Sequence, residues 1–298
     1  MNILLAVDAS SASQAAVDQV AARPWPDGSQ VEVLTVVETP GFLTQGLASD
    51  ELKARAQHLA DAAATHLRSH QLQAKGVVVV GEPKAEILDH AAAMHADLIV
   101  VGANGLGAVE RFLLGSISRA VLRFAPCSVA LVRETAAAGT AGLKVLLAVD
   151  GSDGSRHAIE ATAARPWPSG TEIRVFSVVE LGMSALQASF EIPAFDTAHL
   201  ELQRAEAMKR TEEAIDSARK TLEAAGLTTS ESISVLAASP KEIILQEAAA
   251  WPADWIVLGS HGSSGLSRFL IGSTSETVAT HAACSVEVVR QKPSPAFA

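Results

Sequence analysis

The chain has 298 residues, a formal net charge of −10 at neutral pH and a hydrophobic content of 48%. An acidic chain without a run of lysine or arginine is not expected to bind nucleic acid, because proteins that contact the phosphate backbone carry a basic face. No apolar run approaches the roughly 20 residues that span a bilayer, and Asp8 interrupts the N-terminal apolar stretch early, so neither a membrane span nor a signal peptide is expected. We therefore expect a cytoplasmic protein with no membrane or nucleic-acid partner.

Short β-branched runs alternate with alanine-rich helical patterns from the N-terminus onward. The patterns predict strands over residues 3–7, 31–37, 77–80, 98–101 and 128–132, and helices over 12–22, 50–69, 84–95 and 116–124. Nearly continuous apolar strands between amphipathic helices are typical of a parallel α/β sheet covered on both faces. Ligands of such sheets bind beyond the carboxyl ends of the strands, where the strand order reverses.

A run of small residues over 135–142 separates this pattern from a second copy of it. Three segments recur almost unchanged: residues 2–8 as 144–150, 22–26 as 164–168, and 127–129 as 284–286. We therefore predict two tandem domains, at residues 1–135 and 143–291. The second copy is longer because it carries an insertion around residues 181–210, where no simple periodicity is present. The cysteines recur as well, as Cys127 and Cys284, and are interpreted as small buried core residues.

The most specific repeated feature is a glycine spacing. Gly102 and Gly105 are followed after nine residues by Gly115-Ser116, and the second copy repeats the spacing with Gly259, Gly262 and Gly272-Ser273. Each motif follows an apolar strand and precedes a helical pattern. Free backbone N–H groups and the positive end of a helix dipole would meet there, which favours the binding of a phosphate. The alternative is a tight turn with an ordinary helix cap.

Each glycine has an expected role. Gly102 and Gly259 end a strand where a missing Cβ lets a ribose or a phosphate approach the backbone, and Gly105 and Gly262 allow a turn with positive φ. Ser116 and Ser273 are expected to cap the helix that follows. Asp8 and Asp150 end the first strand of each copy and either cap the next helix or hydrogen-bond a ribose or a base. Both roles are compatible if Ser10 and Ser152 provide the caps.

Other residues are candidates for a role at or near the site. Arg111 and Arg268 occupy equivalent places within the nine-residue segments and either pair with a phosphate or are solvated helix residues. Trp25 and Trp167 are expected to anchor a loop, and His261 has no expected special role. The chain has no P-loop, no nucleophile elbow and no histidine or cysteine cluster with metal-ligand spacing.

Taken together, these motifs resemble the universal stress protein family in its tandem two-domain form. The resemblance is carried by Val149-Asp-Gly-Ser152, by the fourth strand ending in Gly102, by the two glycine motifs and by the final Cys-Ser-Val segments. It implies two Rossmann-like, doubly wound five-stranded parallel sheets with strand order 3-2-1-4-5. It also implies self-association through the last strands, at residues 129–132 and 286–289, as an internal pseudo-dimer and in addition as a homodimer.

The resemblance further implies a bound adenine nucleotide, ATP or else ADP or AMP, with Mg²⁺ as an optional companion. The residues that match the family's binding positions are Asp8, Val36, Gly102, Gly105, Gly115 and Ser116 in the first half, and Asp150, Val178, Gly259, Gly262, Gly272, Ser273 and Thr274 in the second. The second half has Gly151 where the first has Ala9, and we expect it to bind nucleotide more tightly.

Three functions remain open from the sequence. The first is a nucleotide-dependent regulator in stress response with slow or no hydrolysis and no catalytic residue. The second is a weak ATPase or phosphotransferase that uses Arg111 or Arg268. The third is a nucleotide-independent interaction module whose partner surface is the insertion over residues 181–200.

Overall fold

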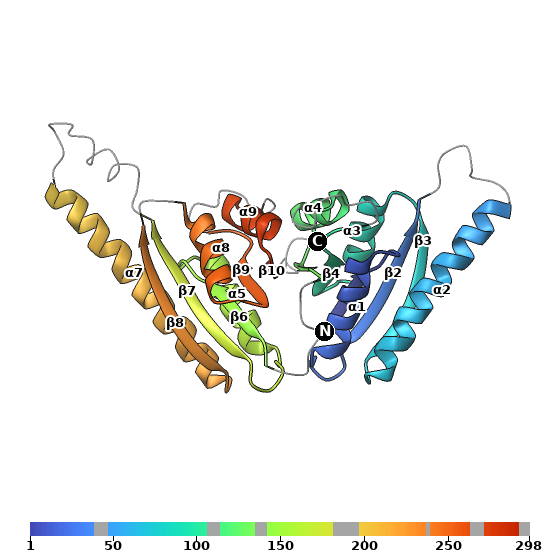
Figure 1. Ribbon diagram of the computed structural model, residues 1–298, viewed down its shortest axis with the longest axis horizontal. Coiled ribbons are helices and arrows are strands. Elements are labelled where there is room, and N and C mark those ends of the chain that lie inside the picture. The colour runs from blue at the N-terminus through green and yellow to red at the C-terminus, as the bar shows by residue number, and fades with distance from the viewer. Residues whose placement is uncertain are drawn as a thin grey trace.

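The computed structural model describes residues 1–38, 47–105, 114–134, 142–180, 197–236, 239–262 and 271–291, which form two similar halves (Figure 1). The first half contains β1 (Asn2–Ala6), α1 (Ser11–Ala22), β2 (Gln30–Val37), α2 (Leu47–Ser69), β3 (Gln73–Val80), α3 (Pro83–Ala93), β4 (Leu98–Gly102), α4 (Ser116–Phe124) and β5 (Ser128–Val132). The second half contains β6 (Lys144–Ala148), α5 (Asp153–Ala164), β7 (Glu172–Glu180), α7 (Thr197–Ala224), β8 (Thr228–Leu236), α8 (Pro240–Ala250), β9 (Trp255–Gly259), α9 (Ser273–His281) and β10 (Ser285–Val289). The end of the predicted insertion is helical, as part of α7, and residues 181–196 lie outside the described ranges.

The strand order within each half is the predicted one. The sheet runs β3-β2-β1-β4-β5-β10-β9-β6-β7-β8, so each half reads 3-2-1-4-5 from its outer edge inward, with parallel neighbours. The two sheets are not separate, however. β5 and β10 pair in antiparallel register, with Val286 opposite Leu131 and Glu287 opposite Ala130, and this joins the halves into one ten-stranded sheet.

Two apolar cores lie on the two faces of this sheet. Successive strand residues point to opposite faces, so Leu4 enters one core while Ile3 and Leu5 enter the other. One core contains side chains of α3, α4, α8 and α9, and the other contains side chains of α1, α2, α5 and α7. The longest helices, α2 and α7, lie at the two outer flanks of the molecule (Figure 1). In each half, the carboxyl ends of the central strands lie at one edge of the sheet, between the helices that cover its two faces.

Two arginines cross between the halves. Arg133, just after β5, donates to the carbonyl oxygens of Ala279 and Thr280 at the end of α9, at 3.3 and 3.0 Å. Arg290, just after β10, donates in the same way to Leu122 and Arg123 at the end of α4, at 2.8 and 3.0 Å. The last carbonyls of a helix have no partner within the helix and carry partial negative charge, so each half supplies the C-terminal cap of a helix in the other.

Replacing Arg290 with alanine is expected to lower the free energy of unfolding by about 2 kcal/mol, because hydrogen bonds from a charged donor contribute about 1.5–3 kcal/mol. The matched control is Arg123→Ala. Arg123 also bridges the halves, to Glu276 at 3.2 Å, but both side chains of that pair are partly exposed. A surface pair contributes about 1 kcal/mol or less. Urea unfolding of both variants checks the difference, and equal losses would contradict the role of Arg290 as a cap.

A cluster of buried charges and tryptophans lies at the same junction. Glu287 is fully buried and forms ion pairs with Arg165 and, at 3.4 Å, with Arg23. The Arg23 guanidinium lies 4.2 Å from the ring centre of Trp167 and 5.1 Å from that of Trp25. As predicted, the two tryptophans also anchor the chain after α1 and α5, because each indole N–H donates to a helix carbonyl, at 2.8 and 2.9 Å. Their contact with Arg23 was not predicted.

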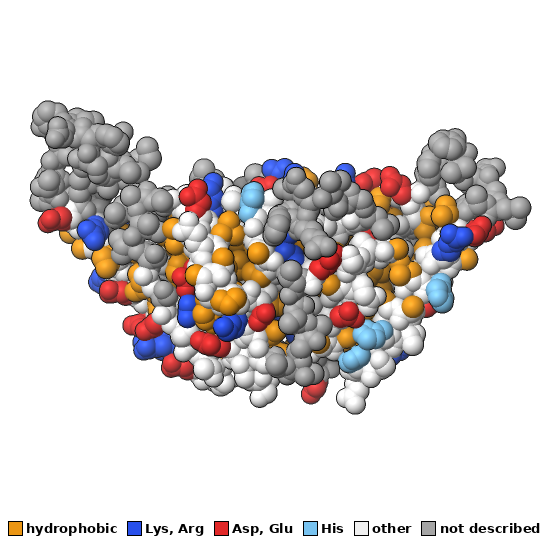
Figure 2. Space-filling model, in the orientation of Figure 1, with side chains coloured by type: hydrophobic (Ala, Val, Ile, Leu, Met, Phe, Trp, Pro, Cys, Tyr) orange, Lys and Arg blue, Asp and Glu red, His pale blue; other side chains and the backbone are white. Residues whose placement is uncertain are grey.

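The remaining surface and core features are simpler. On the face in Figure 2, acidic and basic side chains are interspersed without a continuous basic patch. Among the described helices, none is long and apolar enough to cross a bilayer. Cys127 and Cys284 are buried and unbridged, in agreement with their predicted role in the core, and burial raises the pKa of the Cys284 thiol to about 11.

Candidate functional site

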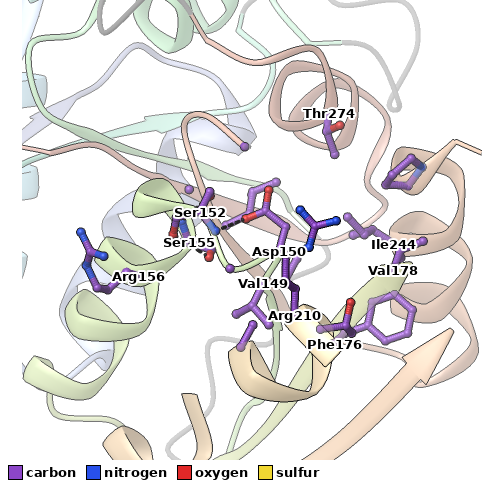
Figure 3. Close-up of a pocket in the computed structure, with 18 of the residues that line it drawn as sticks. Val149, Asp150, Ser152, Ser155, Arg156, Phe176, Val178, Arg210, Ile244 and Thr274 are labelled. Carbon is purple, nitrogen blue, oxygen red and sulfur yellow. Dashed lines mark hydrogen bonds between the residues drawn. The ribbon is translucent and has the colours of Figure 1, made fainter. Parts of the chain in front are cut away.

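A cleft of about 740 Å³ opens in the second half, at the carboxyl ends of β6, β7 and β9. All seven residues predicted for a site in this half line it: Asp150, Val178, Gly259, Gly262, Gly272, Ser273 and Thr274. Figure 3 shows Asp150, Val178 and Thr274 around the same opening. β6 and β9 are neighbours in the sheet, and the strand order reverses between them. The cleft therefore lies where parallel α/β sheets bind their ligands.

The turn from β6 into α5 holds Asp150 at the edge of the cleft. Gly151 has a φ of +76°, which turns the chain in a conformation that glycine adopts without strain. Ser152 then caps α5 as predicted, because its hydroxyl accepts from Ser155 N–H at 3.1 Å. The Ser152 N–H donates to Asp150 Oδ1 at 3.0 Å. Asp150 is thus oriented by the turn and is not the cap of the helix.

The glycine loop closes onto the start of α9. The Gly272 N–H donates to the Ser260 carbonyl at 2.7 Å, and the Ser275 hydroxyl donates to the Gly259 carbonyl at 2.7 Å. Gly272 itself occupies the N-cap position, and among the described residues no side chain caps the helix. The prediction that Ser273 is the cap was therefore wrong, and so was the equivalent prediction for Ser116, because Gly115 is the cap of α4. The first turn of α9 lines the cleft with Ser273 and Thr274, and no side chain in the described ranges caps its N–H groups.

The glycines have other structural roles than predicted. Gly105 and Gly262 do not have positive φ. A Cβ on Gly262 would lie 2.7 Å from Asp150 Oδ2, and one on Gly105 would lie 3.0 Å from Asp8 Oδ2, so the missing side chain leaves room for the carboxylate. At Gly259 a Cβ would lie 2.4 Å from the backbone of Gly154. The space beside the strand end is therefore filled by the first turn of α5.

The backbone of Val178 faces the cleft side of β7. Val149 N–H donates to the Phe176 carbonyl at 2.9 Å, and β6 has already ended at Ala148. Backbone groups alternate in direction along a strand, so Val178 turns its N–H and C=O to the same side, beyond the end of β6. A donor and an acceptor at this spacing can pair with the edge of a planar heterocycle.

The first half repeats these parts with differences around the carboxylate. Ser118 donates to the Gly102 carbonyl at 2.7 Å, and Gly115 N–H donates to the Ala103 carbonyl at 2.8 Å. Asp8 Oδ1 accepts from Ser10 N–H at 3.0 Å, from the Ser10 hydroxyl and from the Ser13 hydroxyl at 2.7 Å. In the second half the Ser155 hydroxyl, which corresponds to that of Ser13, donates instead to the Ser152 carbonyl. Two serine hydroxyls therefore hold Asp8 within its own turn.

Val36 and Ser116 complete the predicted set in the first half. Val7 N–H donates to the Leu34 carbonyl at 2.9 Å, so Val36 has the same orientation as Val178. Ser116 is the first residue of α4. The structure therefore brings the six predicted residues of this half to one edge of the sheet, at the carboxyl ends of β1, β2 and β4.

Arg156, Arg210 and His261 are among the cleft residues that sequence reasoning missed or gave no weight. Arg156 pairs with Asp153 at 2.8 Å, and Arg210 enters the cleft from α7. His261 Nδ1 lies 2.9 Å from the Ser260 hydroxyl, and its Nε2 is buried and has no hydrogen-bond partner among the described residues. Burial and the nearby Arg290 lower the pKa of His261, which keeps the ring neutral at neutral pH. Sequence patterns gave little sign of the role of Arg210, because this residue lies at the end of the insertion, where the two copies are not aligned by the repeated motifs.

The structure gives limited information on the two arginines considered for catalysis and on metal binding. Arg111 and Arg268 lie outside the described residues. Within the described ranges, no group of three or more histidine, cysteine, aspartate or glutamate side chains is arranged to hold a metal ion. The described cleft thus offers hydrogen-bond donors, the carboxylates of Asp150 and Glu213, and the cationic side chains of Arg156 and Arg210, which suit a polar organic ligand with both donor groups and negative charge.

Comparison with known proteins agrees with this geometry. The sequence profile described as the Universal stress protein family matches residues 1–133 and again residues 143–290. The chain belongs to the universal stress protein family. Both halves are members, so the tandem two-domain form inferred from the glycine motifs is confirmed.

Individual known proteins are similar to this chain in sequence or in fold. A universal stress protein of Mycobacterium tuberculosis is 29% identical over 210 residues, which cover 66% of this chain and 62% of that protein. The crystal structure of a universal stress protein from Archaeoglobus fulgidus matches 97% of this chain and 98% of its own, with a TM-score of 0.65 and 20% identity. A protein of unknown function from Pseudomonas aeruginosa matches 98% of this chain and 92% of its own, with a TM-score of 0.62 and 18% identity. At these identities the two structures support the fold alone.

Proposed function

We propose that the chain binds an adenine nucleotide, with ATP as the preferred ligand, and that it acts as a nucleotide-dependent regulator in stress response with slow or no hydrolysis. The observation that carries the proposal is the α9 N-terminus, which lines the cleft and has no capping side chain from the part of the chain that the structure describes. Backbone N–H groups and the helix dipole at such an end attract phosphate. Asp150 and the Val178 backbone stand at the same opening and suit the ribose hydroxyls and the adenine edge.

The equivalent position of the first half is proposed as a second, weaker site. Asp8 is held by two serine hydroxyls, and Ala9 replaces the positive-φ Gly151. A ribose must compete with these local hydrogen bonds for the carboxylate. Mg²⁺, where it accompanies the nucleotide, is proposed to be held by phosphate oxygens. Within the chain, the last strands β5 and β10 pair with each other. We propose in addition that two chains associate.

The first test is the nucleotide content of freshly purified protein, followed by titration with ATP. We expect between one and two adenine nucleotides per chain on denaturation. Gly262→Ala should weaken ATP binding by about tenfold or more, because its Cβ would displace the Asp150 carboxylate from a distance of 2.7 Å. Gly105→Ala is the matched control in the first half and should have the smaller effect. A larger loss from Gly105→Ala would refute the asymmetry, and no binding of any adenine nucleotide would refute the proposed function.

A further inference from the structure

Arg210 lines the cleft, and the proposed function has so far assigned it no role. It lies on α7, and its carbonyl would be 3.9 Å from a Cβ on Gly151, so this turn of the helix packs beside the loop that holds Asp150. Thr211 and Ala214 are buried beneath it, which fixes the rotation of the helix and leaves residue 210 at the rim. Figure 3 shows the Arg210 side chain extending into the cleft.

The contacts of Arg210 leave most of its guanidinium available. Its Nε donates to the Glu206 carbonyl at a long 3.4 Å. In the part of the chain that the structure describes, no carboxylate oxygen lies within 4 Å of the guanidinium. The other cleft arginine, Arg156, is paired with Asp153. Arg210 therefore presents its guanidinium to the cleft without a carboxylate within 4 Å among the described residues, although Asp150 and Glu213 line the same cleft.

The first half shows how the same position behaves as a surface residue. Arg55 stands in α2 at the same distance in sequence from the following strand as Arg210 in α7, and each has a glutamate one turn earlier. Arg55 binds the Glu51 carboxylate at 2.7 Å, which is an ordinary helix-surface pair. Arg210 instead donates to the backbone carbonyl of Glu206, and among the described residues it has no ion pair with a carboxylate. The two halves thus differ at this position, because the arginine of the first half forms an ion pair with the preceding glutamate and that of the second half does not. Only the latter arrangement leaves the guanidinium able to pair with a ligand.

We propose that Arg210 makes the second-half cleft selective for a nucleoside di- or triphosphate over the bare nucleoside, by pairing with the phosphate chain; this inference rests on the nucleotide-binding function proposed above. The α9 N-terminus supplies only about half a positive charge. A phosphate chain carries several negative charges, and a guanidinium matches its oxygens with a planar fork of donors. Arg210 supplies that complement from α7.

The test compares the binding of ATP and of adenosine to the unmodified full-length chain and to three variants. Arg210→Gln should weaken ATP binding by about tenfold and leave adenosine binding unchanged, since a charge-assisted pair stabilises only the phosphate-bearing ligand. Arg55→Gln is the matched control and should bind both ligands as the unmodified chain does. Arg210→Lys should show an intermediate affinity for ATP, because it keeps the charge and loses the fork. The effect on ATP should shrink as salt is raised.

The outcomes separate this inference from the function on which it rests. If the unmodified chain binds ATP and Arg210→Gln keeps the same ratio of ATP to adenosine affinity, Arg210 is a solvated helix residue and the inference is wrong. The same holds if Arg55→Gln loses as much ATP affinity as Arg210→Gln. If the unmodified chain binds neither ligand, the proposed function itself fails, and the inference fails with it. Unchanged circular dichroism and unfolding midpoints verify that the exposed substitutions leave the fold intact.

Discussion

Replacing Glu287 with alanine is expected to lower the free energy of unfolding by about 3–5 kcal/mol, because removal of one partner leaves a buried charge uncompensated. Glu287 is fully buried and pairs with Arg165 and Arg23, which are themselves almost fully buried. Burial lowers the pKa of Arg23 to about 10, and burial together with repulsion by Arg23 lowers that of Arg165 to about 9. Removing the carboxylate leaves these two buried guanidinium groups without the partner that they share.

Urea unfolding followed by tryptophan fluorescence measures the loss of stability. The signal comes in part from the buried charge cluster itself, because Trp25, Trp167 and Trp255 surround Arg23. Glu287→Gln keeps the shape and removes the charge, and should be destabilising by a smaller amount. The control is Glu51→Gln, whose ion pair with Arg55 is exposed and should contribute about 0.5 kcal/mol or less. A loss below about 1 kcal/mol for Glu287→Ala would mean that water or another group compensates the two arginines.

Gly259→Ala is expected to lower the free energy of unfolding by about 3 kcal/mol and to abolish ATP binding in the second half. The new Cβ would lie 2.4 Å from both the carbonyl carbon and the oxygen of Gly154, which are backbone atoms in the first turn of α5. A backbone cannot rotate away as a flexible side chain does, so β9 and α5 must separate. These two elements hold the glycine loop and Asp150, and their separation would widen the cleft.

The control for this substitution is Gly115→Ala, used for stability alone. A Cβ on Gly115 would meet its nearest neighbour, the Ala103 carbonyl oxygen, at 3.4 Å, which is an ordinary contact. Its cost should be about 1 kcal/mol or less, as expected for alanine in place of glycine at an N-cap. Urea unfolding and ATP titration of both variants check the prediction. A Gly259→Ala chain with the unmodified stability and ATP affinity would show that α5 shifts at no cost.

The sequence predicted the fold well because its signals are local and repeated. Continuous apolar strands, helical patterns between them and an identical glycine spacing in each half indicate the sheet type, and the resemblance supplied the strand order. The positions of Asp8, Asp150 and the glycines at strand ends were predicted for the same reason. The caps at Ser10 and Ser152 were also predicted, since serine followed by a helical pattern is a local signal.

The features that sequence reasoning missed depend on contacts between distant segments. Whether Gly259 makes room for a ligand or for Gly154 is decided by how closely α5 approaches β9. Arg210 enters the cleft only because α7 packs against the loop after β6, and no local pattern reveals this. Arg290 and Arg133 are each near the end of a half, and their role as helix caps exists only once the two halves have joined.

The pairing of Glu287 with Ala130 has a consequence for how such proteins evolve. The two residues hold equivalent positions in the two halves and lie directly opposite each other, so they sit on the pseudo-two-fold axis that relates the halves. In a dimer of identical subunits, a residue on the axis faces its own copy, and a buried carboxylate there would meet a second one. Fusion into one chain removes that constraint. A single glutamate can then serve two symmetry-related arginines, an arrangement open only to halves that are free to diverge.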